Sequence, residues 1–468
     1  MDKYKSLKGI LTLLILASTL FVMSGCQNQN NQTEYRLENG CRYLYDFNYL
    51  ITFMEDTSPY FGVVYRNSGV DIRQTAVEAM ERIASNPDMD ESILFDELFD
   101  LFIPLMGIAH ALILDYSSFH HNRILYGSEF FANNNTFGVG NLFSIFSAEA
   151  LESANSIGFY QRQTERGWKP SFNEEEFFSH LFESWVDPSN FPAHPASDGA
   201  VATYIIEEGR IAYMNIPSFF RQNSEVERAN LFDFYAYIQE YEHLIIDIRN
   251  NTGGFSVLWE NDIMLPLGGD LPSVPLYTFF SDSEMGQMFA RMYTENHLQR
   301  RRIMGSAGML SFMSNYPRPL PIAEFAGEGR IANINQNDLQ NLGYVVPMTQ
   351  SVGNLRPEWY VPNVHFQGQI WLLINPLNGS SSSLFARHAK DTGFATLVGE
   401  QTSGNFGGGA SRIFISLPNT GIVATWDTGY KTDIYGNSWE EFRVTPHYEN
   451  RQGLDALQTA LWLIREGH

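Results

Sequence analysis

Residues 244–254 read LIIDIRNNTGG, an apolar run that ends in polar residues and a pair of glycines. The apolar run predicts a buried strand. Three polar residues collect at its carboxyl end, namely Asp247, Arg249 and Asn251. Open α/β sheets place their sites at this end of the strands. Gly253 and Gly254 would let backbone N–H groups face a ligand closely, as an oxyanion hole requires, although the stretch could also be a turn that an Asp–Arg pair stabilises.

Strand-like and helix-like segments alternate after residue 201. The apolar patterns predict strands at 210–216, 244–248, 370–374 and 395–398, and helices at 225–241, 381–390 and 454–465. This alternation indicates an α/β core with a partly parallel sheet over residues 201–468. Within that core, residues 267–363 show little periodicity.

The first half of the chain divides into two regions. Between residues 41 and 115, apolar side chains recur three and four positions apart, which predicts an N-terminal helical region. Residues 116–200 are mixed and rich in Asn, Ser, Phe and Glu. We expect this second segment to lie near a cleft.

Residues 1–26 have the features of a bacterial export signal. Three lysines precede an apolar run that is too short for a membrane span of roughly 20 residues, and Ser24-Gly25-Cys26 follows. The tripeptide resembles a lipobox, which implies a lipid anchor on Cys26 and localisation in the bacterial cell envelope. The alternative is an uncleaved anchor helix. Residues 27–40 would form a polar tether, and Cys41 would have no disulfide partner.

Charge and motif content narrow the function classes. A net charge of −23, without a cluster of Lys and Arg, argues against binding to nucleic acid or to an anionic membrane surface. The sequence has no HExxH, paired CxxC or Walker motif. Neither a metal nor another cofactor is therefore indicated.

Four consecutive serines, Ser380 to Ser383, stand where the predicted strand at 370–374 gives way to a helix. A serine there would lie beside the helix N-terminus, whose N–H groups and positive dipole end can stabilise an oxyanion. Serine is also a favoured N-cap, and on this stretch alone a helix cap is the favoured interpretation. A nucleophile needs a base, and His110 is a candidate because it follows a helix and opens an apolar strand. The alternative is a core histidine bonded to backbone.

In this order the motifs resemble peptidase family S41, the C-terminal-processing and tricorn-core serine peptidases, from about Leu98 onward. The family motif Asp-x-Arg-x-Asn-x-Gly-Gly is matched at every fixed position of residues 247–254. Alignment on Phe385-Ala386 places the family's nucleophile at Ser380, with Ser381 as the alternative register because Ser383 replaces the usual Glu. The resemblance implies a ClpP/crotonase-like α/β fold with a mixed sheet and an N-terminal helical region.

The resemblance also assigns the other catalytic residues. Asn405 stands where the processing branch has its catalytic lysine, so a Ser–Lys dyad is not expected. The tricorn-like branch uses Ser with His and Glu. His110 matches the family's Asp-Gly-His segment at the His, and Glu440 begins a segment similar to Glu-x-x-Gly-Val-x-Pro. Glu441 is the alternative carboxylate.

These matches predict a serine peptidase that hydrolyses peptides or proteins by acyl transfer. His110 would take the proton of Ser380, and Glu440 would hold the imidazole. The backbone N–H groups of Ser381 and Gly254 would bind the oxyanion.

Two other functions remain open. An inactive lipoprotein with this fold could bind peptides or apolar ligands; its support is a set of departures from the family pattern, at Ala109, Ser383, Arg443 and His447. An esterase would use the same triad, but no Gly-x-Ser-x-Gly surrounds Ser380. No PDZ domain is expected, because residues 116–200 lack its glycine-rich loop.

Overall fold

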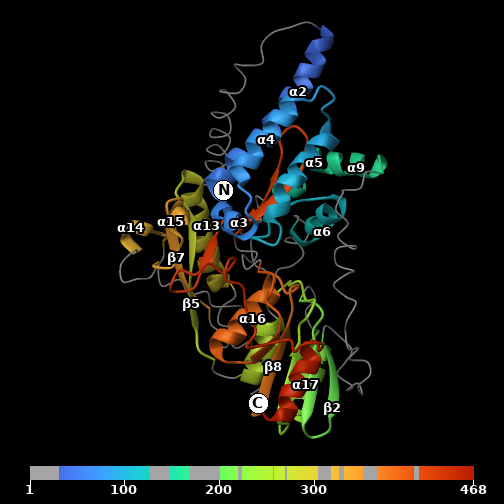
Figure 1. Ribbon diagram of the computed structural model, residues 1–468, viewed down its shortest axis with the longest axis vertical. Helices are drawn as coiled ribbons and strands as arrows, with labels where there is room; N and C mark the ends of the chain where they lie inside the picture. The colour runs from blue at the N-terminus through green and yellow to red at the C-terminus, as the bar shows by residue number, and fades with distance from the viewer. Residues whose placement is uncertain are drawn as a thin grey trace.

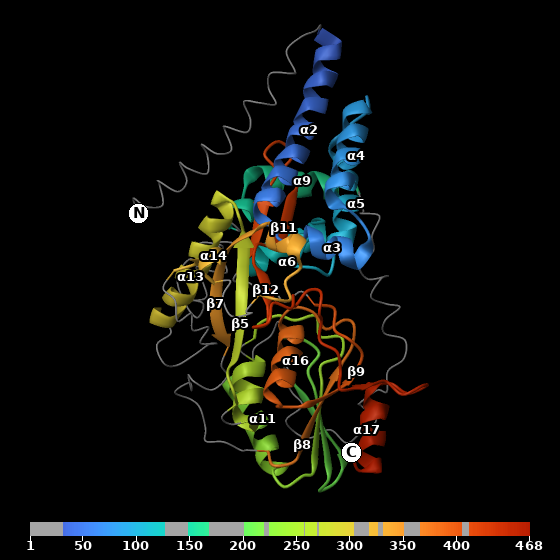
Figure 2. The same ribbon diagram turned by 60° about the vertical axis from the view of Figure 1, so that its left-hand side comes forward.

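The structure is a computed structural model that describes residues 31–126, 148–167, 201–219, 224–256, 258–268, 271–303, 318–325, 331–350, 366–404 and 411–468. Cys26, Asn405 and much of the segment 116–200 lie outside these residues. Figures 1 and 2 show an elongated molecule, with helices at one end, a helix-covered sheet at the other and antiparallel strands between them.

Helices dominate the N-terminal end. They are α2 (Asn31–Thr57), α3 (Phe61–Ser68), α4 (Ile72–Ser85), α5 (Glu91–Phe102), η2 (Ile103–Leu105), α6 (Tyr116–Tyr126) and α9 (Ala154–Glu165). Asp71 and Asp90 start α4 and α5 as N-caps, because their carboxylates accept hydrogen bonds from the first free backbone N–H groups. Helix α2 begins at Asn31, so most of the expected tether is helical.

A six-stranded mixed sheet forms the opposite end of the molecule. Its order is β13 (Tyr448–Glu449), β9 (Thr396–Gly399), β8 (Gln369–Ile374), β4 (His243–Asp247), β3 (Ile211–Asn215) and β2 (Ala202–Glu207). All neighbours are parallel except β2 and β3. The predicted α/β core with a partly parallel sheet is therefore confirmed.

Alternate side chains of these strands point to opposite faces of the sheet. On one face, Ile245, Trp371 and Val398 pack with α17 (Ala456–Glu466). On the other face, Ile246 and Leu372 join the main core, with α11 (Glu225–Tyr237) and α16 (Ser381–Thr392). Figure 2 shows α17 on one side of β8 and α11 with α16 on the other.

Two antiparallel sheets connect the ends. One has the order β12 (Tyr430–Thr432), β5 (Val274–Ser281), β7 (Leu342–Gln350) and β6 (Leu320–Pro321), and the other has β1 (Leu112–Ile113), β11 (Val423–Asp427) and β10 (Arg412–Ser416). The remaining helices are η5 (Leu258–Met264), α12 (Leu265–Gly268), α13 (Glu284–Ile303), α14 (Ile322–Phe325) and α15 (Gln336–Leu339). The strands β5, β6 and β7 therefore lie within the segment 267–363, and β5 and β7 are mostly buried and lack a sequence alternation.

Two expectations, on a membrane-spanning helix and on a PDZ domain, are only partly covered by the described residues. Among the helices that the structure describes, none is long and apolar enough to cross a membrane. The expected absence of a PDZ domain falls largely on residues 127–147 and 168–200, outside the described ranges, and stays a prediction.

Candidate active site

The turn after β4 has two parts. Its first part, with Asp247 and Arg249, stabilises the fold, and its second part, which begins at Asn251, shapes the site. Asp247 is fully buried and accepts hydrogen bonds from Arg249 at 2.7 Å and from Tyr213 at 2.7 Å. Arg249 also reaches Asp455 at 3.2 Å. The Asp–Arg pair therefore anchors the sheet to the start of α17, which is the structural role that the sequence left open.

Asn251 shapes the glycine pair. Its side-chain oxygen accepts a hydrogen bond from the Gly253 N–H at 2.9 Å, and its amide group donates to the Ile216 carbonyl. Gly253 and Gly254 have φ angles of 112° and 123°, which favour glycine. The Gly253 N–H is occupied by its hydrogen bond to Asn251. The Gly254 N–H, in contrast, donates no hydrogen bond within the described residues.

The glycine turn lies directly against the four serines. A Cβ atom on Gly253 would be 2.8 Å from Ser380 Cβ, 2.8 Å from the Gly379 carbonyl oxygen and 3.0 Å from the Ser381 N atom. Only glycine can approach this closely. The structure thus brings together two motifs that are 127 residues apart in the sequence, and it places the glycine turn beside the Ser381 N atom.

Three of the four serine hydroxyls are used inside the fold. Ser381 Oγ accepts from Trp259 Nε1 at 3.0 Å, Ser383 Oγ donates to the Asn378 carbonyl at 2.6 Å, and Ser382 Oγ donates to the Asn251 carbonyl. All three side chains are buried. None of these hydroxyls is available to a substrate without breaking a buried hydrogen bond.

Ser380 differs from its three neighbours. It stands at the N-cap position of α16 yet makes no capping hydrogen bond, and within the described chain its hydroxyl has no partner. It is half-buried, and its φ of 52° is unusual for a residue with a Cβ. Its N–H donates to the Gly404 carbonyl at 3.0 Å, which fixes this strained backbone. Such strain is typical of functional sites.

His110 lies in the loop between η2 and β1, and its imidazole contacts a carboxylate. Nδ1 is 2.6 Å from Asp427 Oδ2, and the Asp427 N–H donates to the Ala109 carbonyl at 2.7 Å. Asp427 is fully buried, whereas the His110 side chain is 13% exposed. Ala109 and His110 have φ angles of 53° and 51°, so the loop that presents the imidazole is itself strained.

Asp427 was not identified from the sequence. It is 317 positions from His110, and the resemblance pointed to Glu440 instead. The one available signal was an acidic residue at the end of the apolar run 422–426. No described hydrogen bond joins Ser380 to His110.

Glu440 and Glu441 have different environments. Glu440 is fully buried, and a Cβ on Gly404 would be 3.0 Å from its Oε2 atom, so this carboxylate lies beside the backbone that holds Ser380. Glu441 forms an ion pair with Arg66 at 2.7 Å. Because Asp427 occupies His110 Nδ1, the role of Glu440 as the residue that holds the imidazole stays a prediction.

A buried lysine follows Asp427 in the chain. Lys431 on β12 is 5% exposed, and burial lowers its pKa to about 8, although the charges of Asp427 and Glu440 act in the opposite direction. Nothing in the sequence pattern marked this residue.

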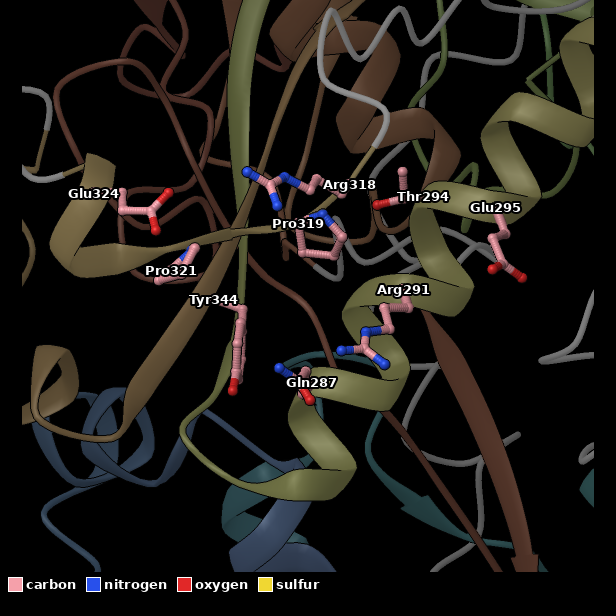
Figure 3. Close-up of a pocket in the computed structure, with 9 residues that line it drawn as sticks. All are labelled: Gln287, Arg291, Thr294, Glu295, Arg318, Pro319, Pro321, Glu324 and Tyr344. Atoms are coloured by element: carbon pink, nitrogen blue, oxygen red, sulfur yellow. The ribbon is translucent and has the colours of Figure 1, made fainter. Parts of the chain in front are cut away.

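The pocket in Figure 3 lies away from these residues, between α13, β7 and the segment 318–324. It has a volume of about 360 Å³, and Arg291, Arg318 and Tyr344 are among its lining residues. None of the predicted catalytic residues lines it. The described residues also contain no group of three or more His, Cys, Asp or Glu that could hold a metal ion.

Residues 210–450, about half of the chain, match the family model described as Peptidase family S41. The chain belongs to peptidase family S41. The matched part of this S41 chain includes the 247–254 turn, Ser380 and Glu440, whereas His110 precedes it. The family expected from the sequence motifs is therefore confirmed.

Solved structures share the fold of this S41 protein. Mature CPAF complexed with lactacystin is 15% identical, with a TM-score of 0.52 and coverage of 91% of this chain and 97% of that chain. Mature CPAF is likewise 15% identical, with a TM-score of 0.52 and coverage of 88% and 92%. At 15% sequence identity, the likeness to these solved structures shows only a shared fold. Membership of family S41 supports a peptidase that acts on peptides or proteins.

Proposed function

We propose that this S41 member is an exported serine peptidase in which Ser380 is the nucleophile and His110 the general base. His110 takes the hydroxyl proton while Ser380 Oγ bonds to the carbonyl carbon of the substrate, and it later gives that proton to the leaving amine. Water then hydrolyses the acyl-enzyme by the same proton transfers. The backbone N–H groups of Ser381 and Gly254 are the proposed donors to the oxyanion.

The state of the Ser380 hydroxyl carries this proposal. Its three neighbours use their hydroxyls in buried hydrogen bonds, whereas Ser380 makes no cap and has a strained φ of 52°. Gly253 approaches it so closely that no side chain would fit between them. A helix cap requires none of these features, whereas a free hydroxyl on a strained backbone beside a close glycine turn is typical of a nucleophile next to an oxyanion hole.

Hydrolysis of casein by the purified chain tests the activity. The wild type should cleave casein, Ser380→Ala should lower kcat by at least about a thousandfold, and Ser381→Ala should retain most activity. A folded wild type that binds casein without cleaving it would favour the inactive binding protein. Greater loss in Ser381→Ala than in Ser380→Ala would support the alternative register.

Two carboxylates compete for the role of the residue that orients His110. The 2.6 Å contact with Nδ1 favours Asp427, whereas the family resemblance favours Glu440. We expect Asp427→Asn to lower kcat by about a thousandfold or more, because a neutral amide would select the wrong imidazole tautomer. Glu440→Gln should cost less than Asp427→Asn. The reverse ranking would return the role to Glu440.

Export and a lipid anchor on Cys26 are part of the proposal. Their support is the charged start, the short apolar run and the Ser24-Gly25-Cys26 tripeptide of the sequence. Metabolic labelling with palmitate in a bacterial host should mark the full chain and not the Cys26→Ala variant. Equal labelling of both forms, or of neither, would contradict an anchor at this cysteine.

A further inference from the structure

A pocket apart from the catalytic residues is lined by two arginines. It lies between α13, β7 and the segment 318–324, and its volume is about 360 Å³. Arg291 belongs to α13, and Arg318 stands just before β6. Within the described residues, neither guanidinium group has a hydrogen bond or an ion pair. Both positive charges of this arginine pocket are therefore open to a ligand.

Several other arginines of the described chain do have acidic partners. Arg66, Arg162 and Arg228 pair with carboxylates at 2.6, 2.8 and 2.9 Å. Acidic residues are also abundant, because the sequence has 53 of them against 30 basic ones. A guanidinium group presents its N–H donors in one plane, a geometry that matches a carboxylate. The partner that the fold does not supply in the arginine pocket can therefore come from a ligand.

Helical spacing builds one wall of the arginine pocket. Gln287, Arg291 and Glu295 are each four residues apart, so they share one face of α13. Phe289 and Tyr293 lie on the opposite face of this helix and belong to the main core. The packing of that face fixes α13 and aims the polar face at the pocket.

The rest of the lining narrows the class of ligand. Glu295 and Glu324 lie at opposite ends of the pocket, with Arg318 between them (Figure 3). A polyanion such as a nucleic acid would meet a repelling carboxylate at each end, whereas a single carboxylate would not extend so far. Pro319 and Tyr344 add largely apolar surface, against which the neighbouring residues of a peptide can pack. This combination fits an acidic side chain within a polypeptide.

The register of the sheet places the arginine pocket within reach of a substrate. Tyr430 of β12 pairs with β5, β5 pairs with β7, and β7 pairs with Leu320 of β6. Neighbouring strands are about 4.8 Å apart, and Asp427 precedes β12 by three residues, so the pocket lies roughly 15 to 20 Å from Asp427. An extended peptide advances about 3.3 Å per residue. About five or six residues would span this distance.

From these observations, and resting on the proposed peptidase function, we propose that the arginine pocket is an exosite for acidic side chains of a protein substrate. Arg291 and Arg318 bind an aspartate or glutamate carboxylate that lies outside the cleaved bond. The net charge of −23 opposes the approach of acidic proteins in general, so a local pair of arginines gives selectivity among them. The exosite increases affinity and leaves the chemistry at Ser380 unchanged.

Peptide binding to the full chain with Ser380→Ala tests the pocket without cleavage. The probe is a fluorescein-labelled peptide of four Glu-Gly repeats, and four Gln-Gly repeats form its neutral match. By fluorescence anisotropy, the Kd of the Glu peptide should be lower by at least about tenfold. Arg291→Gln and Arg318→Gln should each weaken its binding by about three- to tenfold. Arg465→Gln, which changes an exposed arginine of α17 outside the pocket, should have no effect.

Steady-state hydrolysis of dephosphorylated casein links the arginine pocket to catalysis. In the double variant Arg291→Gln/Arg318→Gln, KM should rise by about tenfold while kcat stays within about twofold of the wild type. With casein whose carboxyl groups have been converted to amides, the two forms should have the same KM. Fluorophosphonate should react with both at the same rate, because this reagent carries no acidic peptide.

The outcomes separate the exosite from the proposed function. Equal binding of the Glu and Gln peptides, or equal losses in Arg291→Gln and Arg465→Gln, would overturn the exosite and leave the peptidase intact. Competition by succinate as strong, per carboxylate, as that by unlabelled Glu peptide would indicate a site for small acids and would also overturn it. A chain that binds the Glu peptide selectively, yet cleaves no casein and reacts with no fluorophosphonate, would overturn the proposed function, and the exosite role with it.

Discussion

His388 is a buried imidazole that has no hydrogen-bond partner on either ring nitrogen within the described residues. It lies in α16, eight residues after Ser380, and its ring is 5.9 Å from that of Trp259, whose indole N–H bonds to Ser381. Burial lowers the pKa of His388 to about 4. An imidazole in this setting is a packing residue behind the nucleophile rather than a second base.

The lowered pKa of His388 predicts a loss of stability in acid. The folded state disfavours the charged form, so the unfolded state binds more protons as pH falls from about 6.5 to about 4, and stability falls with it. Urea denaturation at pH 7 and pH 4.5 should show a difference in unfolding free energy that is smaller in His388→Phe than in the wild type, by about 2 to 3 kcal/mol. An equal pH dependence in both would contradict the buried, neutral imidazole.

Gly253 gives a second prediction at the scale of single residues. Gly253→Ala should lower kcat by at least about a hundredfold, because the new Cβ would meet Ser380 Cβ at 2.8 Å and displace the nucleophile. Gly209→Ala is the matched control, since Gly209 also has a positive φ, of 73°, and has no atom within 4 Å of an added Cβ. Equal activity of the two variants would contradict the placement of Gly253 against the nucleophile.

Sequence motifs identified some site residues and could not identify others. Ser380 and Gly254 stand in local patterns of fixed spacing, and His110 opens an apolar strand. Asp427 and Lys431 have no such pattern. Asp427 acquires a role because β11 brings it to a loop more than 300 positions earlier in the chain, and a single sequence carries no record of that pairing.

At the scale of elements, Asp455 stabilises the start of α17 in two ways. Asp455 caps the helix by accepting from the Gln458 N–H, and it pairs with Arg249 of the family motif at 3.2 Å. Arg249 is 4% exposed. The turn after β4 is thus tied to α17, which packs on the face of the sheet opposite to α16.

Two substitutions separate these functions of Asp455. Asp455→Asn keeps a good N-cap and removes the charge that faces the buried Arg249, so it should lower the unfolding free energy by about 2 kcal/mol. Asp455→Ala removes both and should cost about 3 kcal/mol or more. Chemical denaturation measures both values. If Asn were as costly as Ala, the cap would contribute nothing.

The elements that could be predicted are those with a clear local pattern. The strands β4 and β8 and the helix α16 follow the apolar runs of the sequence. The sheet of β5 and β7 was missed because its strands are mostly buried, so polar and apolar residues do not alternate. Their register depends on long-range pairing instead.

At the scale of the whole molecule, the N-terminal helices are joined to the S41 core by buried polar contacts. Asp46 of α2 accepts hydrogen bonds from the backbone N–H groups of Asn419 and Thr420, at the turn between β10 and β11. Arg66 of α3 pairs with Asp338 at 2.6 Å and with Glu441 at 2.7 Å. These contacts tie the helical region to the β10–β11 turn and to the segments that carry Asp338 and Glu441.

Arg66 tests this connection. Arg66→Ala leaves Asp338, which is 3% exposed, without its ion pair, so it should lower the unfolding free energy by about 2 to 3 kcal/mol. Arg82→Ala is the control, because its pair with Glu97 is formed by an arginine side chain that is 52% exposed, and it should cost less than about 1 kcal/mol. Thermal or urea denaturation gives both values. Equal losses would mean that the Arg66 pair is no more than a surface contact.

The central claim is that Ser380 is a nucleophile activated by His110, and reaction of the full chain with a fluorophosphonate tests it most directly. Mass spectrometry with fragmentation should locate the adduct on Ser380 among the four serines. We expect no adduct with Ser380→Ala, normal reaction with Ser381→Ala and a rate at least about a hundredfold lower with His110→Ala. An adduct on another serine, or none on the folded wild type, would contradict the claim.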